Sequence, residues 1–381
     1  MGFVEDFVRR MLDDLGMDCP VGLVGCRALG PCSFEPCAYD VMLFDGNTPL
    51  GDTVIECDGD GDGADATAAV VAAVDGDDDD DDDDDGSGNG NGNGNGVRAG
   101  TRRRDSRRKK LVITRHASLS ESDSGRLLQY DAMRVLHDPS WDLRMMLQRI
   151  EKRRGALYRD LARNSLLQSM FCCQRAQSSD GGAGDRGSVL GVADARGQHD
   201  GSGSPDMFAP CWQKCASLYL ADAICALNCK RPSPSHMLEV MRGLPKSPVN
   251  AHFSVVSDTM GIERATPTLL ERMTSSTAGF ADHECVAGGT KGGLGSSAAI
   301  SSKHDYFISE SMMTDCYFYL CYVNKENMSR VQSTLHRNPG LFHILRVALD
   351  VERDDSLLQK NAAAVQESCR MLLESLSGRG R

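Results

Sequence analysis

The first third of the chain alternates between one helical pattern and several short apolar runs. Apolar side chains recur every three or four residues from Phe3 to Leu15, which predicts a helix over residues 3–16 with one buried face. Apolar runs of four to six residues that end at glycine or charged side chains are typical of buried strands. The strands predicted in this way are Val21–Val24, Tyr39–Phe44, Thr53–Cys57 and Leu111–Arg115.

The apolar spacing changes to a helical period from Trp141 onward. The helical segments that it predicts are 141–174, 210–228, 235–242, 247–260, 265–276, 304–337 and 339–376. No strand is required after residue 140, so the sequence predicts an α+β chain in two domains. The first domain, 1–140, has a small mixed sheet, and the second, 141–376, is all-helical.

Three segments interrupt these patterns. Residues 58–110 and 178–205 have few apolar side chains, so burial cannot offset an ordering cost of about 1–2 kcal/mol per residue. We expect both to be disordered insertions, the first in the hairpin loop between strands 53–57 and 111–115. The Gly/Ser-rich stretch 287–303 is predicted to be a flexible linker.

Charge is distributed unevenly along the 381 residues. Residues 58–85 contain 14 aspartates, and residues 98–110 contain eight Lys or Arg side chains. The rest of the chain is only mildly acidic despite the net charge of −12, which argues against a broad nucleic-acid-binding surface. The basic run Arg102–Lys110 is interpreted as a solvated linker, with contact to nucleic acid as the alternative.

The cysteine content and the N-terminal segment bear on the compartment. The 15 cysteines are an odd number, and Met1–Met17 mixes charged with apolar residues, unlike a secretory signal. These features favour reduced thiols and a cytoplasmic protein. No apolar run reaches the length of a membrane span, so no membrane partner is expected.

The candidate chemistry lies around the first two strands. The first strand stops at Gly25, the segment Gly25-Cys26-Arg27-Ala28-Leu29-Gly30 follows, and Asp40 lies near the start of the second strand. Glycine lets a backbone approach a phosphate closely because it has no Cβ. A short helix after the turn would direct free N–H groups at the anion, and a carboxylate on the next strand can hold a phosphate-bridging metal ion.

This stretch resembles the signature of the small nucleotidyltransferases of the DNA-polymerase-β type, in which G-S-R-A-x-G precedes S-D-x-D. A second match is Val135-Leu136-His137-Asp138-Pro139, which is similar to the late strand of these domains, where an apolar run enters L-Y-D-P. For Asp138, the alternative is ordinary turn chemistry at the end of a strand.

The resemblance implies a nucleotide-binding protein that transfers a nucleoside monophosphate, with Mg²⁺ and an NTP such as ATP as cofactors. Asp40 would be a catalytic carboxylate and metal ligand. A further acid must come from an adjacent strand, and Glu56, on the third strand, is the best-placed candidate for a catalytic and metal-binding role. The residues that would bind the nucleotide are Gly25, Cys26, Arg27 and Gly30.

Two positions depart from the family pattern. Cys26 stands in place of the usual serine, and Met42 in place of the second aspartate of D-x-D. Because Mg²⁺ prefers oxygen ligands, a methionine does not replace that carboxylate. Two interpretations stay open: a nucleotidyltransferase with a degraded metal site, or a lapsed transferase fold that acts as a regulatory or assembly module. A nucleotide and a second copy of the chain are the expected partners, and the sequence specifies no nucleic-acid or protein acceptor.

The helical domain contains a second motif, Arg231 to His236 (RPSPSH). It resembles the R-x4–6-H motif of HEPN domains, which implies a ribonuclease in which His transfers a proton and Arg contacts the scissile phosphate. The alternative is a helix start, with Ser233 as N-cap, Pro234 at the first helical position and Glu239 in the first turns.

Four cysteines of the segment 210–228 and its end form two pairs spaced by one helical turn. Two interpretations are open for them: ligands of a structural metal ion, or small apolar side chains of a buried helix. The four are Cys211, Cys215, Cys225 and Cys229.

Overall fold

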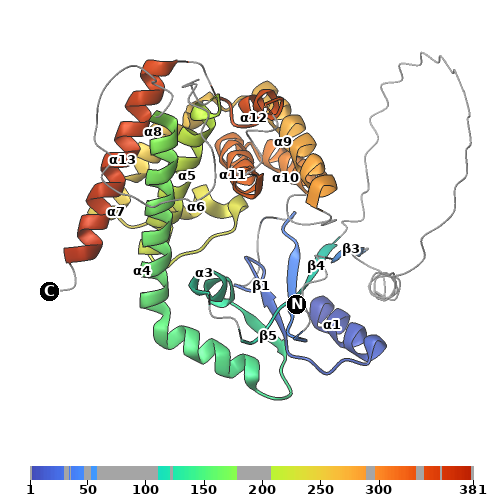
Figure 1. Ribbon diagram of the computed structural model, residues 1–381. Helices are drawn as coiled ribbons and strands as arrows, with labels where there is room; N and C mark the ends of the chain where they lie inside the picture. The colour runs from blue at the N-terminus through green and yellow to red at the C-terminus, as the bar shows by residue number, and fades with distance from the viewer. Residues whose placement is uncertain are drawn as a thin grey trace, which may run out of the picture.

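The computed structural model describes residues 2–29, 34, 36–46, 53–57, 110–120, 123–177, 207–288, 297–331, 339–351 and 354–378. These residues form an N-terminal part built on a sheet and a larger helical part (Figure 1). The α+β class predicted from the sequence is confirmed, and every element described after residue 140 is helical.

Five strands form one mixed sheet in the order β3-β4-β2-β1-β5. The strands are β1 (Val21–Val24), β2 (Tyr39–Leu43), β3 (Thr53–Cys57), β4 (Lys110–His116) and β5 (Arg134–His137). β2 runs parallel to β4, and the other neighbouring pairs are antiparallel. The four strands predicted from apolar runs and the late strand are all present, so these predictions are confirmed.

Helices cover both faces of the sheet, because the strands carry apolar side chains on both faces. On one face Phe7 and Met11 form a buried cluster with Val41. On the opposite face Met42 and Phe44 belong to a second cluster. The covering helices are α1 (Gly2–Leu15) on the first face, and α3 (Ser124–Leu127), η1 (Leu128–Tyr130) and α4 (Asp142–Gln177) on the second.

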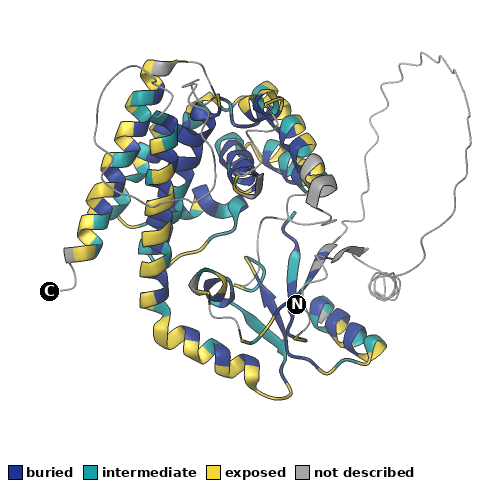
Figure 2. Cartoon of the chain, in the orientation of Figure 1, coloured by how far each residue is buried: buried dark blue, intermediate teal, exposed yellow. Residues whose placement is uncertain are grey.

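The 36 residues of α4 connect the two parts as one helix, which bends between them (Figure 1). Met146 and Ile150 in its first half are buried with the sheet part, whereas Leu166 and Cys173 in its second half are buried with the helical part. Exposed side chains follow its outer surface (Figure 2). The helix therefore has a separate apolar stripe for each part of the molecule.

The helical part is built around α5 (Ala209–Leu227), in which 15 of the 19 residues are buried. A helix that is apolar on all sides belongs in a core, and Figure 2 shows α5 enclosed by the helices around it. The remaining elements are η2 (Pro234–His236), α6 (Met237–Arg242), α7 (Pro248–Ala251), α8 (Phe253–Met260), η3 (Ile262–Arg264), α9 (Pro267–Gly288), α10 (Ser297–Ser309), α11 (Met313–Val331), α12 (Leu341–Ala348) and α13 (Asp355–Gly378).

The structure corrects the predicted linker and shows how the strands on either side of the first predicted insertion are paired. α9 ends at Gly288 and α10 begins at Ser297, so the linker predicted over 287–303 is wrong for residues 287–288 and 297–303. Residues 58–109 and 178–205 lie outside the described residues. The strands that flank the first insertion are paired, with Cys57 opposite Lys110, so the predicted hairpin is confirmed. Among the described helices, none combines the length and the apolar character needed to cross a membrane.

Candidate functional site

Gly25 and Asp40 lie side by side at the end of β1. Asp40 pairs with Val24 in the antiparallel register of β1 and β2. Gly25 has a φ of +76°, and a Cβ at this position would lie 3.0 Å from Oδ2 of Asp40. A side chain here would be both strained and crowded. Asp40 therefore faces the Gly25 turn.

The turn after Gly25 differs from the prediction. Residues 25–29 form successive turns, in which Ala28 N–H donates to Gly25 O and Leu29 N–H donates to Cys26 O. The short helix expected here is not found among the described residues of this loop, and Gly30 lies outside them. Residues 25–29 thus supply no helix N-terminus for a phosphate.

A cation already lies beside Asp40. Nη2 of Arg115, on β4, is 3.9 Å from Oδ1 of Asp40, and the two side chains are 28% and 15% exposed. Arg115 is two residues beyond Ile113, which pairs with Asp40, so both side chains share one face of the sheet. The guanidinium of Arg115 therefore already neutralises the negative charge of Asp40, which would otherwise attract Mg²⁺.

The two other carboxylate positions of the expected metal site are not assembled around Asp40. Glu56 lies on β3, and β4 separates β3 from β2, so the expectation that Glu56 is on an adjacent strand is wrong. Neighbouring strands are about 4.8 Å apart, which places the two backbones about 10 Å apart or more. The side chain of Glu56 lies outside the described residues. Met42 is buried in the cluster under α4, with 5% exposure.

Arg27 holds the loop that connects β1 to β2. Its Nε donates to the carbonyl of Cys37 at 3.1 Å, and its Nη2 donates to the carbonyl of Phe34 at 3.4 Å. Its guanidinium also lies 5.1 Å from the centre of the Tyr39 ring. In this arrangement the side chain expected to bind a phosphate instead fixes the position of Cys37.

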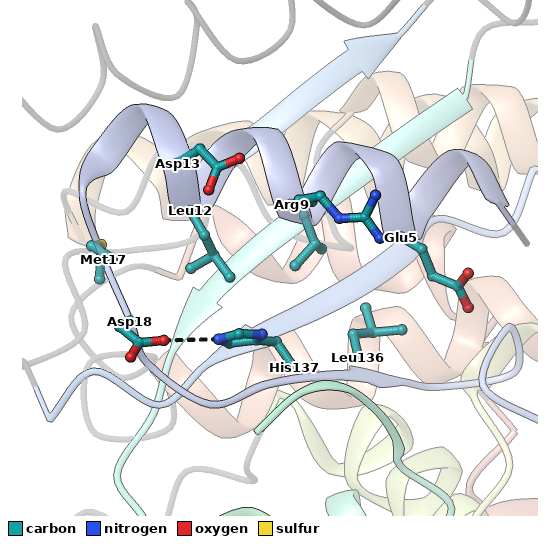
Figure 3. A pocket seen from close by; sticks show the side chains of 9 residues that line it. Glu5, Arg9, Leu12, Asp13, Met17, Asp18, Leu136 and His137 are labelled. Atoms are coloured by element: carbon teal, nitrogen blue, oxygen red, sulfur yellow. Dashed lines mark hydrogen bonds and ion pairs between the residues drawn. The ribbon is translucent and has the colours of Figure 1, made fainter. Parts of the chain in front are cut away.

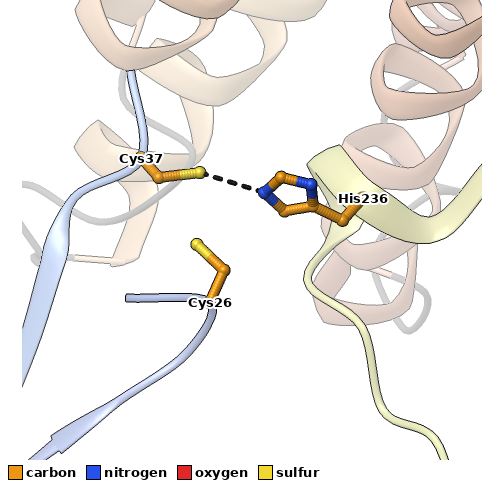
Figure 4. A group of neighbouring side chains, drawn as sticks. All are labelled: Cys26, Cys37 and His236. Carbon is orange, nitrogen blue, oxygen red and sulfur yellow. Dashed lines mark hydrogen bonds between the residues drawn. The ribbon is translucent and has the colours of Figure 1, made fainter. Parts of the chain in front are cut away.

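Cys26, Cys37 and His236 converge where this loop meets the helical part (Figure 4). Their ligand atoms all lie within 4.8 Å of one another, and Sγ of Cys37 is 3.4 Å from Nε2 of His236. Nδ1 of His236 is 3.0 Å from the Glu239 carboxylate. The hydrogen bond with Cys26 raises the pKa of His236, and Glu239 adds to this shift while burial opposes it.

Lys303 extends from α10 toward the same place. It is 6% exposed, and its ammonium lies 5.1 Å from the centre of the Tyr319 ring. Burial lowers the pKa of Lys303, and the charges of Cys37, Asp40 and Cys26 act in the opposite direction. The junction therefore gathers two thiols, an imidazole, a carboxylate and an ammonium from both parts of the chain.

The HEPN-like pair does not come together. Arg231 donates to the carbonyl of Gly125 in α3, whereas the His236 ring is held by Cys37 and Glu239. Ser233 and Pro234 occupy the N-cap and first position of η2, as the helix-start alternative predicted, but the Ser233 side chain makes no capping hydrogen bond.

The four cysteines of the α5 segment do not converge either. Among the described residues, the group of Cys26, Cys37 and His236 is the one set of three or more side chains positioned to ligate a metal ion. Cys215 and Cys225 instead contact the sulfurs of Met328 and Met237. Burial raises the pKa of both thiols, and Cys211 is buried as well, so the buried-helix alternative holds for these three cysteines, whereas Cys229 is half-buried beyond the end of α5.

Asp138 caps a helix. Its two carboxylate oxygens accept hydrogen bonds from the backbone N–H groups of Leu143 and Arg144, at the start of α4. The carboxylate also favourably faces the positive end of the helix dipole. Turn chemistry, the alternative left open by the sequence, accounts for this residue.

A hollow of about 340 Å³ between α1 and β5 shares no residue with this junction (Figure 3). Its wall includes an ion pair of 2.9 Å between His137 and Asp18. Its charged side chains of both signs partly cancel, and the hollow gathers no set of catalytic groups. The lining residues are Glu5, Val8, Arg9, Leu12, Asp13, Met17, Asp18, Leu136 and His137.

Comparison with known proteins finds no family model, no curated protein and no solved structure that matches the chain. The resemblance to nucleotidyltransferases therefore depends on the motif residues alone.

The contributions of Cys37, Arg115 and Lys303 were not predicted from the sequence. Cys37 and His236 are 199 residues apart, and no spacing rule connects them. Lys303 falls in a stretch whose glycine and serine content indicated a linker. One indication was present in the sequence. Arg27 of the motif precedes Cys37 in the loop between β1 and β2, so a contact between this cation and the loop could have been expected.

Proposed function

We propose that this protein is a nucleotidyltransferase-like scaffold that has lost nucleotidyl transfer and acts as a regulatory or assembly module. The observation that carries the proposal is the use of the motif residues in internal contacts. Arg27 binds two carbonyl groups of its own loop, and Asp40 lies beside Arg115.

The chemistry of transfer supports this proposal. Two-metal catalysis needs several oxygens that hold two cations about 3.5–4 Å apart. Here the β2 position that would supply the second carboxylate is Met42, buried in an apolar cluster. A single Mg²⁺ at Asp40 would also compete with the neighbouring guanidinium.

Weak binding of an Mg²⁺–nucleotide complex is the second candidate. It is favoured by Gly25, because a backbone without a Cβ lies close to the Asp40 carboxylate and can also approach a phosphate closely. Binding would require Arg27 to exchange its two carbonyl acceptors for phosphate oxygens, a charge-assisted and therefore stronger interaction.

Titration calorimetry with MgATP and a nucleotidyl-transfer assay test the proposal on the full chain. We expect no transfer by the parent protein, and the same heats for the parent and Asp40→Asn. Asp160→Asn, an exposed substitution on α4, is the matched control. Transfer by the parent that Asp40→Asn abolishes and Asp160→Asn preserves would overturn the scaffold proposal. Binding that depends on Asp40, without transfer, would establish the second candidate.

A further inference from the structure

We propose that Cys26, Cys37 and His236 form a binding site for a thiophilic divalent cation, Zn²⁺ in the cell, that fastens the sheet part to the helical part. The inference does not depend on the scaffold proposal, because it uses only the geometry of these three side chains. It adds a metal site of a different kind from the Mg²⁺ site that the sequence motif implies.

The distances between the ligand atoms fit a tetrahedral zinc ion. Zn–S bonds of about 2.3 Å and Zn–N bonds of about 2.0–2.1 Å imply S···N separations of about 3.6 Å and S···S separations of about 3.8 Å. Sγ of Cys37 lies 3.4 Å from Nε2 of His236, and no pair among the three ligand atoms exceeds 4.8 Å. Shifts of about 1 Å or less in side-chain position complete the geometry, which is within the range of small rotamer adjustments.

The surroundings of His236 are those of a metal ligand. A ligating histidine usually donates its second ring N–H to a carboxylate, which fixes the ring and its tautomer. Glu239 accepts at Nδ1 from a distance of 3.0 Å, so Nε2 is the nitrogen directed at the sulfurs. The ring of Phe34 packs edge-on against the imidazole with 5.3 Å between centres, which restricts its rotation.

The loop that carries the cysteines is also held in place. Gly25 and the turn after it position Cys26, and the Arg27 guanidinium binds the carbonyl of Cys37 itself. Cys37 is 7% exposed, and the His236 side chain is 13% exposed. Both sides of the site are therefore positioned before a metal ion arrives, which lowers the ordering cost of binding.

The charges at the junction favour two thiolates and a soft metal. Thiolate ligands select zinc over magnesium or calcium, and two thiolates balance the charge of one Zn²⁺. The buried ammonium of Lys303 interacts electrostatically with both cysteines, and a positive charge there favours negative charge on their sulfurs. Among the described residues no fourth His, Cys, Asp or Glu joins the group.

Two other uses of these side chains make different predictions. A disulfide between Cys26 and Cys37 would bring the sulfurs to about 2.05 Å and would remove both thiols from titration. A cysteine nucleophile activated by His236 would require substrate to reach a sulfur in a residue that is 7% exposed. Because the carboxylate of Glu239 could also orient His236 for such a nucleophile, the metal content of the protein distinguishes the two uses.

The test measures metal content and affinity on the full chain, purified under reducing conditions. We expect one Zn²⁺ per chain by mass spectrometry of the elements, and a cobalt–thiolate charge-transfer band after replacement with Co²⁺. His236→Ala and Cys37→Ser should lose the metal, whereas Cys229→Ser, a partly exposed cysteine outside the group, should retain it. Glu239→Gln should keep the fold and weaken affinity by about 10–100-fold.

Circular dichroism of each variant separates loss of metal from loss of fold. If Cys37→Ser does not fold, Glu239→Gln in competition with a chromophoric chelator provides the decisive measurement. A folded, reduced parent that binds no Zn²⁺ or Co²⁺, or that binds as much after His236→Ala, would overturn the proposal. A Cys26–Cys37 disulfide in the native protein, with no metal uptake after reduction, would overturn it in favour of a redox pair.

Discussion

At the scale of single residues, Met42 shows how a motif position changes its physical role. In the family pattern this position holds a metal-binding carboxylate. Here the side chain is 5% exposed and shares a cluster with Val24 and Phe44 beneath α4. The sequence alone suggests that an aspartate at this position would restore a ligand, but the packing shows that it would enter an apolar core.

Met42→Asp is therefore expected to destabilise the protein without improving nucleotide binding. An uncompensated buried charge costs about 3–5 kcal/mol. Met42→Leu preserves volume and apolar character and should cost less than about 1.5 kcal/mol. Urea unfolding gives both values, and calorimetry with MgATP measures binding. Tighter Mg²⁺-dependent binding by a folded Met42→Asp variant would contradict this expectation.

Some of the side chains at the junction could be predicted from the sequence, and others could not. Gly25 faces Asp40 because a strand, a turn and an antiparallel strand follow one another, a local pattern that apolar runs and glycine reveal. His236 and Lys303 reach the junction through the packing of helices far along the chain. No local pattern encodes such contacts, since they depend on how the whole helical part packs.

At the scale of elements, α10 shows why composition misleads in Gly/Ser-rich segments. Residues 297–303 contain serine and alanine and little that distinguishes a helix from a linker. The helix forms because Ile300, Lys303 and Phe307 recur at helical spacing and are buried. Burial of one face against the neighbouring helices outweighs the weak local propensity. Strongly periodic elements, such as α1 and α4, were predictable from the same rule.

Gly155 lies within α4, and its substitution tests the continuity of this helix. The residue is exposed, and a Cβ at this position meets no atom within 4 Å. Gly155→Ala should therefore stabilise the protein by about 0.5–1 kcal/mol, because alanine loses less backbone entropy in a helix. Gly155→Pro should cost about 3 kcal/mol or more.

Gly279→Ala is the matched control, since Gly279 is also exposed and unobstructed but lies in α9, within the helical part alone. Denaturant unfolding of both alanine variants should show similar gains. Stabilisation by Gly279→Ala together with destabilisation by Gly155→Ala would mean that α4 opens at Gly155 in solution.

At the scale of the whole molecule, the acidic and basic insertion is expected to be separable from the fold. Its two ends are adjacent, because Cys57 and Lys110 are paired across β3 and β4. A short turn can therefore replace the insertion without moving either strand. The cost of closing a loop rises only with the logarithm of its length, which explains how the sheet tolerates so long a connection.

Deleting residues 60–108 is expected to leave the thermal midpoint unchanged or to raise it by a few degrees. Closing the shorter loop contributes up to about 2–3 kcal/mol from loop entropy. Differential scanning calorimetry of the parent and the deletion variant measures the change. A fall of more than about 4 °C, which corresponds to over about 1 kcal/mol, would show that the insertion contributes to the fold.

The contact between Cys37 and His236 can form only late in the synthesis of the chain. These residues are separated by 199 positions, and a ribosome that adds about 5–20 residues per second needs about 10 to 40 s to make that length of chain. Once β5 (Arg134–His137) has been made, the sheet part can fold while Phe34 still lacks the His236, Tyr306 and Phe307 rings that later cover it. The nascent protein thus presents an uncovered aromatic loop that only the later helices protect from association with other chains.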